Sequence, residues 1–344
     1  MSSASSPTAR AVPIRRLRDQ PIVPAAAVAR YGAIFNAGLV HHGGRFHLFA
    51  RGVRDGYRRN VGPGPRFVDY VSDILVFESV DGHDYQFRYV LAASGEATGV
   101  HCFEDPRVQV VRSAGRDHLV MTYTNLPHPS SGDPWRIGAH RIHFRDERFW
   151  LDDTSAALLG PAGVANKDAV VFNLADERVA LIHRIHPHMQ LAVFEDLEHL
   201  WTADETYWAQ HLQEIDSHVI IRKSEQALGV GAGAPPVAVP EGLLLFFHER
   251  DNEGVYTMQV ALLDHATGRV TAQLGRPLLA PELEWERVGD VDDVIFVQGA
   301  HLLDDDTIYV TYGAADRCVG AAIVSAGELM AAFGLRRASP RPSS

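Results

Sequence analysis

Two adjacent carboxylic acids, followed by a proline and an arginine, occupy residues 104–107 inside an apolar, strand-like run. Proline fixes its own φ and disfavours the helical region for the residue before it, so the sequence predicts an extended Asp105. A carboxylic acid held rigidly at a strand end can act as a general acid. For an isolated motif of this kind, a polar turn between two strands is the more common interpretation.

Cations recur where other strand-like runs end or begin. Arg51, Arg184 and His248 each follow an apolar run, and Lys167 precedes one. Cations brought to one point would repel each other unless an anion joined them, and arginine and lysine both bind phosphate well. The pattern therefore predicts an anion site. The alternatives are that each cation is a solvated strand end and that Lys167 and Asp168 form a surface ion pair of little consequence.

An internal repeat predicts the elements that would position these residues. An apolar run ending in a polar group recurs five times, roughly every 60 to 70 residues, which suits blades of four short strands with loop insertions. The runs are residues 46–51, 118–125, 179–184, 243–249 and 308–316. The repeat predicts an all-β fold, a five-bladed β-propeller over residues 26–336, with a flexible N-terminal tail over residues 1–25 and a C-terminal tail over residues 337–344. Short helices are expected at 195–201, 206–213 and 327–333.

The composition excludes several classes of protein. The chain has 344 residues and a formal net charge of −11, which argues against a nucleic-acid partner and an anionic membrane surface. Cys102 and Cys318 are its two cysteines, too few for a disulfide framework. There is no secretory signal or membrane span in the sequence, so a cytoplasmic protein is expected, and a homo-oligomer is left open. Three histidines, His183, His186 and His188, lack partners at metal-ligand spacing, so no metal is expected.

One acid and several cations together indicate a particular reaction. Glycoside cleavage by water commonly needs two carboxylates, one as acid and one as base or nucleophile. Inorganic phosphate is already an anionic nucleophile, so a cationic cluster can take the place of the second carboxylate. The pattern predicts an inverting glycoside phosphorylase that needs no cofactor and uses phosphate as co-substrate.

The chain resembles glycoside hydrolase family 130, the mannoside phosphorylases and related mannosidases, which are five-bladed β-propellers. The resemblance is carried by residues 35–38 with Arg51, then 104–107, 121–124, 166–172, 183–184, 231–236, 247–248 and 312–316. The chain departs from the family pattern in residues 54–67, which form a longer loop than usual, and in the extra histidines His186 and His188, which are expected near the leaving sugar.

The resemblance implies roles for single residues. Asp105 matches the catalytic general acid, which in this family acts through the O3 hydroxyl of the sugar. The residues implied to hold the mannosyl ring are Asn36, Arg51, Glu104 and Asp316, and those implied to bind phosphate are Lys167, Arg184, His248 and Tyr256.

The expected activity is that of a glycosyl-transferring phosphorylase. It would cleave a β-1,2- or β-1,4-linked manno-oligosaccharide or other β-mannoside with phosphate and release α-mannose 1-phosphate. One alternative is an inverting β-mannosidase on the same scaffold, with Glu225 or Glu249 activating water. Another is a carbohydrate-binding propeller without turnover.

Overall fold

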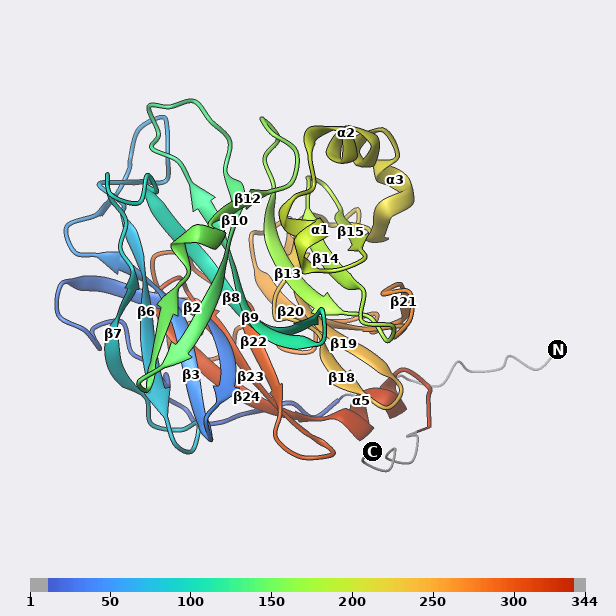
Figure 1. Ribbon diagram of the computed structural model, residues 1–344. Coiled ribbons are helices and arrows are strands. Elements are labelled where there is room, and N and C mark those ends of the chain that lie inside the picture. The colour runs from blue at the N-terminus through green and yellow to red at the C-terminus, as the bar shows by residue number, and fades with distance from the viewer. Residues whose placement is uncertain (1–11, 337–344) are drawn as a thin grey trace.

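Five antiparallel sheets surround a central axis in the computed structural model, which describes residues 12–336 (Figure 1). Within this part of the chain, each sheet is one blade, and its strands follow one another outward from the axis. The predicted five-bladed β-propeller is confirmed.

Each blade has a core of four strands. Blade 1 is β2 (Tyr31–His42), β3 (Arg45–Arg54), β6 (Ser72–Ser79) and β7 (Gln86–Ala92). Blade 2 is β8 (Cys102–Ser113), β9 (Arg116–Leu126), β10 (Arg136–Arg145) and β11 (Arg148–Leu151), with β12 (Ala157–Leu159) paired to β10. Blade 3 is β13 (Lys167–Asn173), β14 (Val179–Arg184), β15 (Met189–Phe194) and β16 (Val219–Ile221). Blade 4 is β17 (Ala227–Ala232), β19 (Gly242–Asp251), β20 (Tyr256–Leu263) and β21 (Val270–Gln273), with β18 (Val237–Val239) paired to β19. Blade 5 is β22 (Ile295–Leu302), β23 (Thr307–Ala314), β24 (Cys318–Ser325) and β1 (Arg15–Arg16).

The five apolar runs of the repeat are the second strands of the five blades: β3, β9, β14, β19 and β23. Residues 243–247 of β19 are all buried, because neighbouring blades cover both faces of each sheet. Five apolar clusters lie between consecutive blades, and each draws side chains from two of them. Continuous apolar runs, in place of strict alternation, are the expected result of burial on both faces.

The ring is closed by the segment that precedes blade 1. Arg15–Arg16 pairs with β24 as the outermost strand of blade 5, and Val23 bridges to Val319. The Arg16 guanidinium binds both carboxylate oxygens of buried Glu286, at 2.7 Å each. The prediction of a flexible tail over residues 1–25 is therefore wrong for the described residues 12–25. The remaining tail residues, 1–11 and 337–344, lie outside the described part of the chain.

Short helices connect or end the blades. The three predicted helices are present as α1 (Leu197–Trp201), α2 (Glu205–Gln213) and α5 (Ala326–Ala332). The others are α3 (Ile215–His218), α4 (Glu284–Arg287) and the 3₁₀ turn η1 (Asp153–Ser155). Side chains of Asp196 and Asp204 cap the first turns of α1 and α2. Among residues 12–336, none of the helices combines the length and the apolar character that crossing a membrane requires.

A two-stranded hairpin, β4 (Arg58–Arg59) and β5 (Phe67–Val68), projects from blade 1 between β3 and β6. It lies in the segment that the sequence predicts to be a long loop. Its strands are short, and Tyr57, Phe67 and Tyr70 contact one another through their rings. Tyr57 and Tyr70 also pack against buried apolar side chains of β2 and β3, which holds the hairpin against the blade.

Candidate active site

The structure brings the predicted site residues together from all five blades. They occur mainly on the first and second strands, which lie nearest the axis. Asn36 is on β2, Glu104 and Asp105 on β8 and Lys167 on β13, while Arg51, Arg184 and His248 are on the second strands β3, β14 and β19, Asp316 follows β23, and Tyr256 begins β20. Residues far apart in sequence thus share one region, as the repeat predicted.

Irregular backbone aims several of these side chains. Asn36, Asp105 and Asp168 have positive φ values of 47°, 51° and 54°. Each lies where its strand shifts register against the next one, which is a β-bulge or a similar irregularity. A bulge leaves a residue out of the ladder and turns its side chain, and asparagine and aspartate tolerate the left-handed region better than most residues. The bulges therefore direct polar side chains out of otherwise regular strands.

The predicted extended conformation of Asp105 is wrong. Proline at 106 does keep Asp105 out of the right-handed helical region, but the residue adopts a left-handed conformation with φ 51°. The register shift between Glu104 and Arg107 accounts for this, and the Arg107 Nη1 donates a 3.0 Å hydrogen bond to the Asp105 carbonyl. The backbone of the candidate acid is held by a neighbouring side chain as well as by the ladder.

The acid centre consists of Asp105 and its contacts. Its Oδ1 accepts hydrogen bonds from Asn36 Nδ2 at 2.7 Å and from Arg51 Nη1 at 3.2 Å. The other terminal nitrogen of Arg51 binds Glu104. The Arg51 guanidinium also packs on the rings of Phe35 and Tyr70, with its Cζ 5.0 and 5.2 Å from their centroids. These aromatic contacts help to hold the guanidinium, which in turn holds both carboxylates.

The three carboxyl groups of this centre differ in proton affinity. Burial raises the pKa of Asp105, but the charges of Arg51, Lys167 and Arg107 outweigh it, so this pKa lies below its ordinary value. Burial raises the pKa of Glu104 more than Arg51 lowers it. Burial also raises the pKa of Asp316 to about 7, against Arg51 and with help from the negative charge of Asp105. At neutral pH Asp105 is thus ionised and Asp316 partly protonated.

A cationic centre surrounds Asp168, next to the acid centre. Its carboxylate accepts a 2.7 Å hydrogen bond from Arg184 Nε and lies 3.4 Å from Arg107 Nη2 and 3.7 Å from His248 Nε2. Lys167 acts electrostatically on both Asp168 and Asp105. Burial raises the pKa of Asp168, but the charges of Arg184, Lys167 and Arg107 outweigh it and hold this pKa far below its ordinary value. Asp168 is the built-in anion that lets several cations lie together.

Arg107 joins the two centres. It is 2% exposed, and besides Asp168 and the Asp105 carbonyl it donates 2.7 Å hydrogen bonds to the carbonyls of Ala232 and Gly233 on blade 4. One planar guanidinium therefore holds three blades at the axis. A buried charge is tolerated only with this degree of pairing.

The remaining wall of the cationic centre is aromatic. The His248 ring stacks on Phe296, with centroids 4.0 Å apart, and lies 6.1 Å from the Tyr256 ring. Burial lowers the pKa of His248 to about 3, although the charge of Asp168 acts in the opposite direction, so the imidazole is neutral in this state. A Cβ on Gly231 would collide with the Asp168 carboxylate and would lie 2.7 Å from His248 Nε2, which explains why glycine stands there. Tyr256 borders the centre through His248.

Asp168 and Arg107 are the residues that the sequence did not assign. The available signal was a charged side chain directly beside an apolar strand, since Lys167–Asp168 precedes residues 169–172 and Arg107 precedes Val108. The surface-pair interpretation of Lys167 and Asp168 is wrong, because Asp168 is 1% exposed.

The histidine-rich segment of blade 3 serves a structural purpose in part. His183 is fully buried, with its Nδ1 3.1 Å from Asn166 Oδ1 and its Nε2 3.1 Å from His211 Nε2 on α2. His188 Nδ1 accepts a hydrogen bond from the backbone of Lys223 at 3.1 Å. The contact between His183 and His211 anchors the helical insertion between β15 and β16 to the blade that supplies Arg184.

The fold is that of a propeller enzyme, and the linked acid and cationic centres form its candidate active site. The chain belongs to glycoside hydrolase family 130: the family model, described as beta-1,4-mannooligosaccharide phosphorylase, matches residues 7–334. It is an enzyme of this mannoside phosphorylase family.

Relatives agree over nearly the whole chain. A 1,2-beta-oligomannan phosphorylase of Thermoanaerobacter sp. (strain X514) is 28% identical over 319 residues, 91% of this chain and 97% of that protein. A beta-1,2-mannobiose phosphorylase of the same organism is 31% identical over 325 residues, 90% of this chain and 97% of that protein. The structure of a beta-1,2-mannobiose phosphorylase from Listeria innocua shares the fold, with a TM-score of 0.68 at 18% identity, over 93% of this chain and 99% of that one.

Proposed function

We propose that this protein is an inverting β-mannoside phosphorylase that releases α-mannose 1-phosphate. The observation that carries the proposal is the cationic centre around Asp168, which lies beside a single well-held acid, Asp105. A phosphate oxygen would attack the anomeric carbon while the bond to the leaving oxygen breaks. The proton of Asp105 would pass to that oxygen, directly or through a sugar hydroxyl.

Each centre would have its own task in this reaction. Asn36, Arg51, Glu104 and Asp316 would hold the mannosyl ring, because they offer fixed donors and acceptors around the acid. Lys167, Arg184 and His248, with Tyr256 at the edge, would bind phosphate. Arg184 uses its Nε for Asp168, which leaves its two terminal nitrogens for an oxyanion. Arg107 would act as a positioning residue for both centres.

For the linkage we propose β-1,2. The two relatives that match about nine-tenths of this chain are named for β-1,2-linked substrates, whereas the family description names β-1,4. Parallel assays with β-1,2- and β-1,4-mannobiose test this choice. Faster phosphorolysis of the β-1,4 disaccharide would contradict it.

The decisive experiment measures turnover with and without inorganic phosphate. Mannose 1-phosphate should form only with phosphate, and Asp105→Asn should lower the rate by about 10² or more, the usual share of general acid catalysis. Free mannose released at an equal rate without phosphate would refute phosphorolysis and favour the mannosidase alternative. In that case a rate loss in Glu225→Gln or Glu249→Gln would identify the base.

A further inference from the structure

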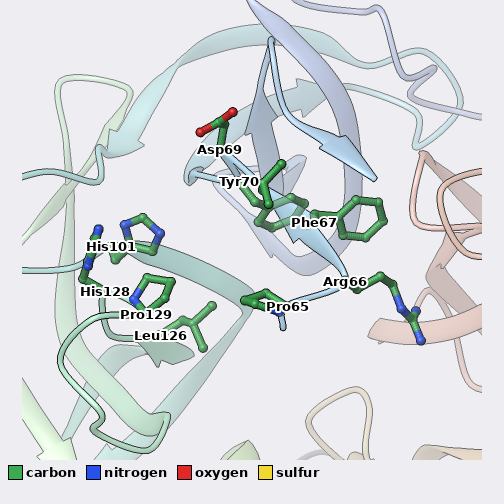
Figure 2. A pocket seen from close by; sticks show the side chains of 10 residues that line it. Pro65, Arg66, Phe67, Asp69, Tyr70, His101, Leu126, His128 and Pro129 are labelled. Atoms are coloured by element: carbon green, nitrogen blue, oxygen red, sulfur yellow. The ribbon is translucent and has the colours of Figure 1, made fainter. Parts of the chain in front are cut away.

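A pocket of about 420 Å³ lies between blade 1 and blade 2, and none of the roles above uses it (Figure 2). The β4–β5 hairpin and the segment after it form one wall, with Pro65, Phe67 and Tyr70. The opposite wall is His101, just before β8, and Leu126 and His128 at the end of β9 and in the loop beyond it. Figure 2 shows the two groups of side chains facing each other across the pocket. Its volume is in the range of small-molecule sites.

The pocket adjoins the acid centre. Tyr70 lines it and also packs on the Arg51 guanidinium that binds Asp105. Arg66, another lining residue, points toward blade 5 in Figure 2, and its charge lowers the pKa of Asp316. The pocket therefore borders the residues proposed to hold the mannosyl ring.

The pocket and the cationic centre are supplied by different sides of the propeller. Blades 1 and 2 form the pocket, and blades 3 and 4 supply Lys167, Arg184 and His248. Asp105 on blade 2 is linked to the pocket through Arg51 and Tyr70, and to the cationic centre through the charge of Lys167. An inverting displacement requires the attacking group and the leaving group on opposite faces of the anomeric carbon. With phosphate at the cationic centre, the leaving group must point away from blades 3 and 4.

We propose that this pocket binds the leaving group of the substrate by the flat apolar face of a six-membered ring. The ring would belong either to the pyranose of a second sugar or to an aryl aglycone. This inference rests on the proposed function, because it takes the cationic centre as the phosphate side. From the sequence, His186 and His188 are expected near the leaving sugar, but they lie on the blade that supplies Arg184. The leaving group would instead contact the hairpin of blade 1.

The aromatic side chains of the pocket can bind the flat apolar face of a six-membered ring. Phe67 and Tyr70 are stacked, with centroids 5.4 Å apart and planes at 22°. His101 and His128 meet edge to face at 4.8 Å. Aromatic rings bind the C–H face of a sugar or another ring, and Asp69 at the exposed edge can accept hydrogen bonds from hydroxyls. The hairpin that carries Phe67 is the departure from the family pattern seen in the sequence.

The test compares Phe67→Ala and His128→Ala with matched controls outside the pocket, Phe87→Ala on β7 and His143→Ala on β10. Initial rates are measured with β-1,2-mannobiose and with 4-nitrophenyl β-mannoside at saturating phosphate. The pocket variants should lower kcat/KM by about three- to tenfold, the value of one lost aromatic contact, and leave the KM for phosphate unchanged. Both controls should behave as the wild type.

The two substrates distinguish the two sources of the ring. A loss confined to mannobiose assigns the pocket to a pyranose, and one confined to the nitrophenyl mannoside assigns it to an aryl group; either supports the proposal. Unchanged kcat/KM with both substrates, or an equal loss in the controls, would overturn it. Binding of mannobiose to Asp105→Asn enzyme with and without the Phe67 change, measured by calorimetry, gives the same answer whether the wild type uses phosphate or water. Melting curves confirm that each variant is folded.

Discussion

Replacement of Asp168 by asparagine tests the central role of this carboxylate. The change keeps the shape of the side chain and removes its charge. Asp168 Oδ2 accepts from Arg184 Nε at 2.7 Å and lies 3.7 Å from His248, while Oδ1 faces Arg107 at 3.4 Å. An amide can accept on one side only, so its NH₂ group must face a cationic donor on the other.

The expected cost follows from this geometry. Removing one partner of a buried ion pair destabilises a protein by about 3–5 kcal/mol, because the remaining charge is buried without compensation. For a chain of this length, with about 2 °C per kcal/mol, the melting temperature should fall by about 6–10 °C. The loss of a charged hydrogen bond to Arg184 should also raise the KM for phosphate by about ten- to a hundredfold.

The assay combines thermal unfolding in phosphate-free buffer with phosphorolysis rates at varied phosphate. The matched control is Asp176→Asn, since Asp176 pairs with Arg178 at 2.7 Å in the exposed turn between β13 and β14 and should leave both measurements unchanged. If Asp168→Asn melted with the wild type and kept its KM for phosphate, the cations would not depend on Asp168. The account of the cationic centre would then be wrong.

Two further changes probe the surroundings of this centre. Gly231→Ala places a Cβ against the Asp168 carboxylate and the His248 ring and should destabilise the fold by about 1–3 kcal/mol, whereas Gly229→Ala, with nothing within 4 Å, should be tolerated in the same urea titration. Burial lowers the pKa of His211 to about 4 and holds that of His183 well below its ordinary value, so the folded state resists protonation of both and loses stability as pH falls below about 6.5. His211→Asn should reduce the loss between pH 7 and pH 4 by up to about 3 kcal/mol relative to the wild type, and parallel pH profiles of the two proteins would contradict this.

The architecture could be predicted because every blade repeats the same burial. The second strands are covered by a neighbouring blade on each face, so each appears in the sequence as a continuous apolar run. The polar residue that ends each run then marks the end of the strand that lies in the candidate site. For Arg51, Arg184 and His248 this local signal was sufficient to predict their convergence, although they lie far apart in the sequence.

The sequence could not reveal how the charges are paired. Arg107 binds carbonyls of Ala232 and Gly233, which are more than 120 positions away and carry no side-chain signal. The left-handed conformation of Asp105 depends on a register shift between β8 and β9. Pro106 predicts only that Asp105 avoids the right-handed helical region, not which other conformation it adopts. The closing strand Arg15–Arg16 is short, and its pairing depends on the fifth blade being complete.

The low proton affinity of Asp105 is consistent with its proposed role as an acid. Its pKa is depressed by Arg51, Lys167 and Arg107, and Lys167 also belongs to the group proposed to bind phosphate. A phosphate anion beside Lys167 would offset that positive charge and add negative charge near Asp105, and both effects raise the pKa of a carboxyl group. Asp316, whose pKa of about 7 leaves it partly protonated, would provide a proton nearby. In the proposed reaction, the binding of phosphate would therefore raise the pKa of Asp105 enough for it to carry a proton. Mannoside cleavage would then need bound phosphate both as the attacking group and for protonation of the leaving oxygen.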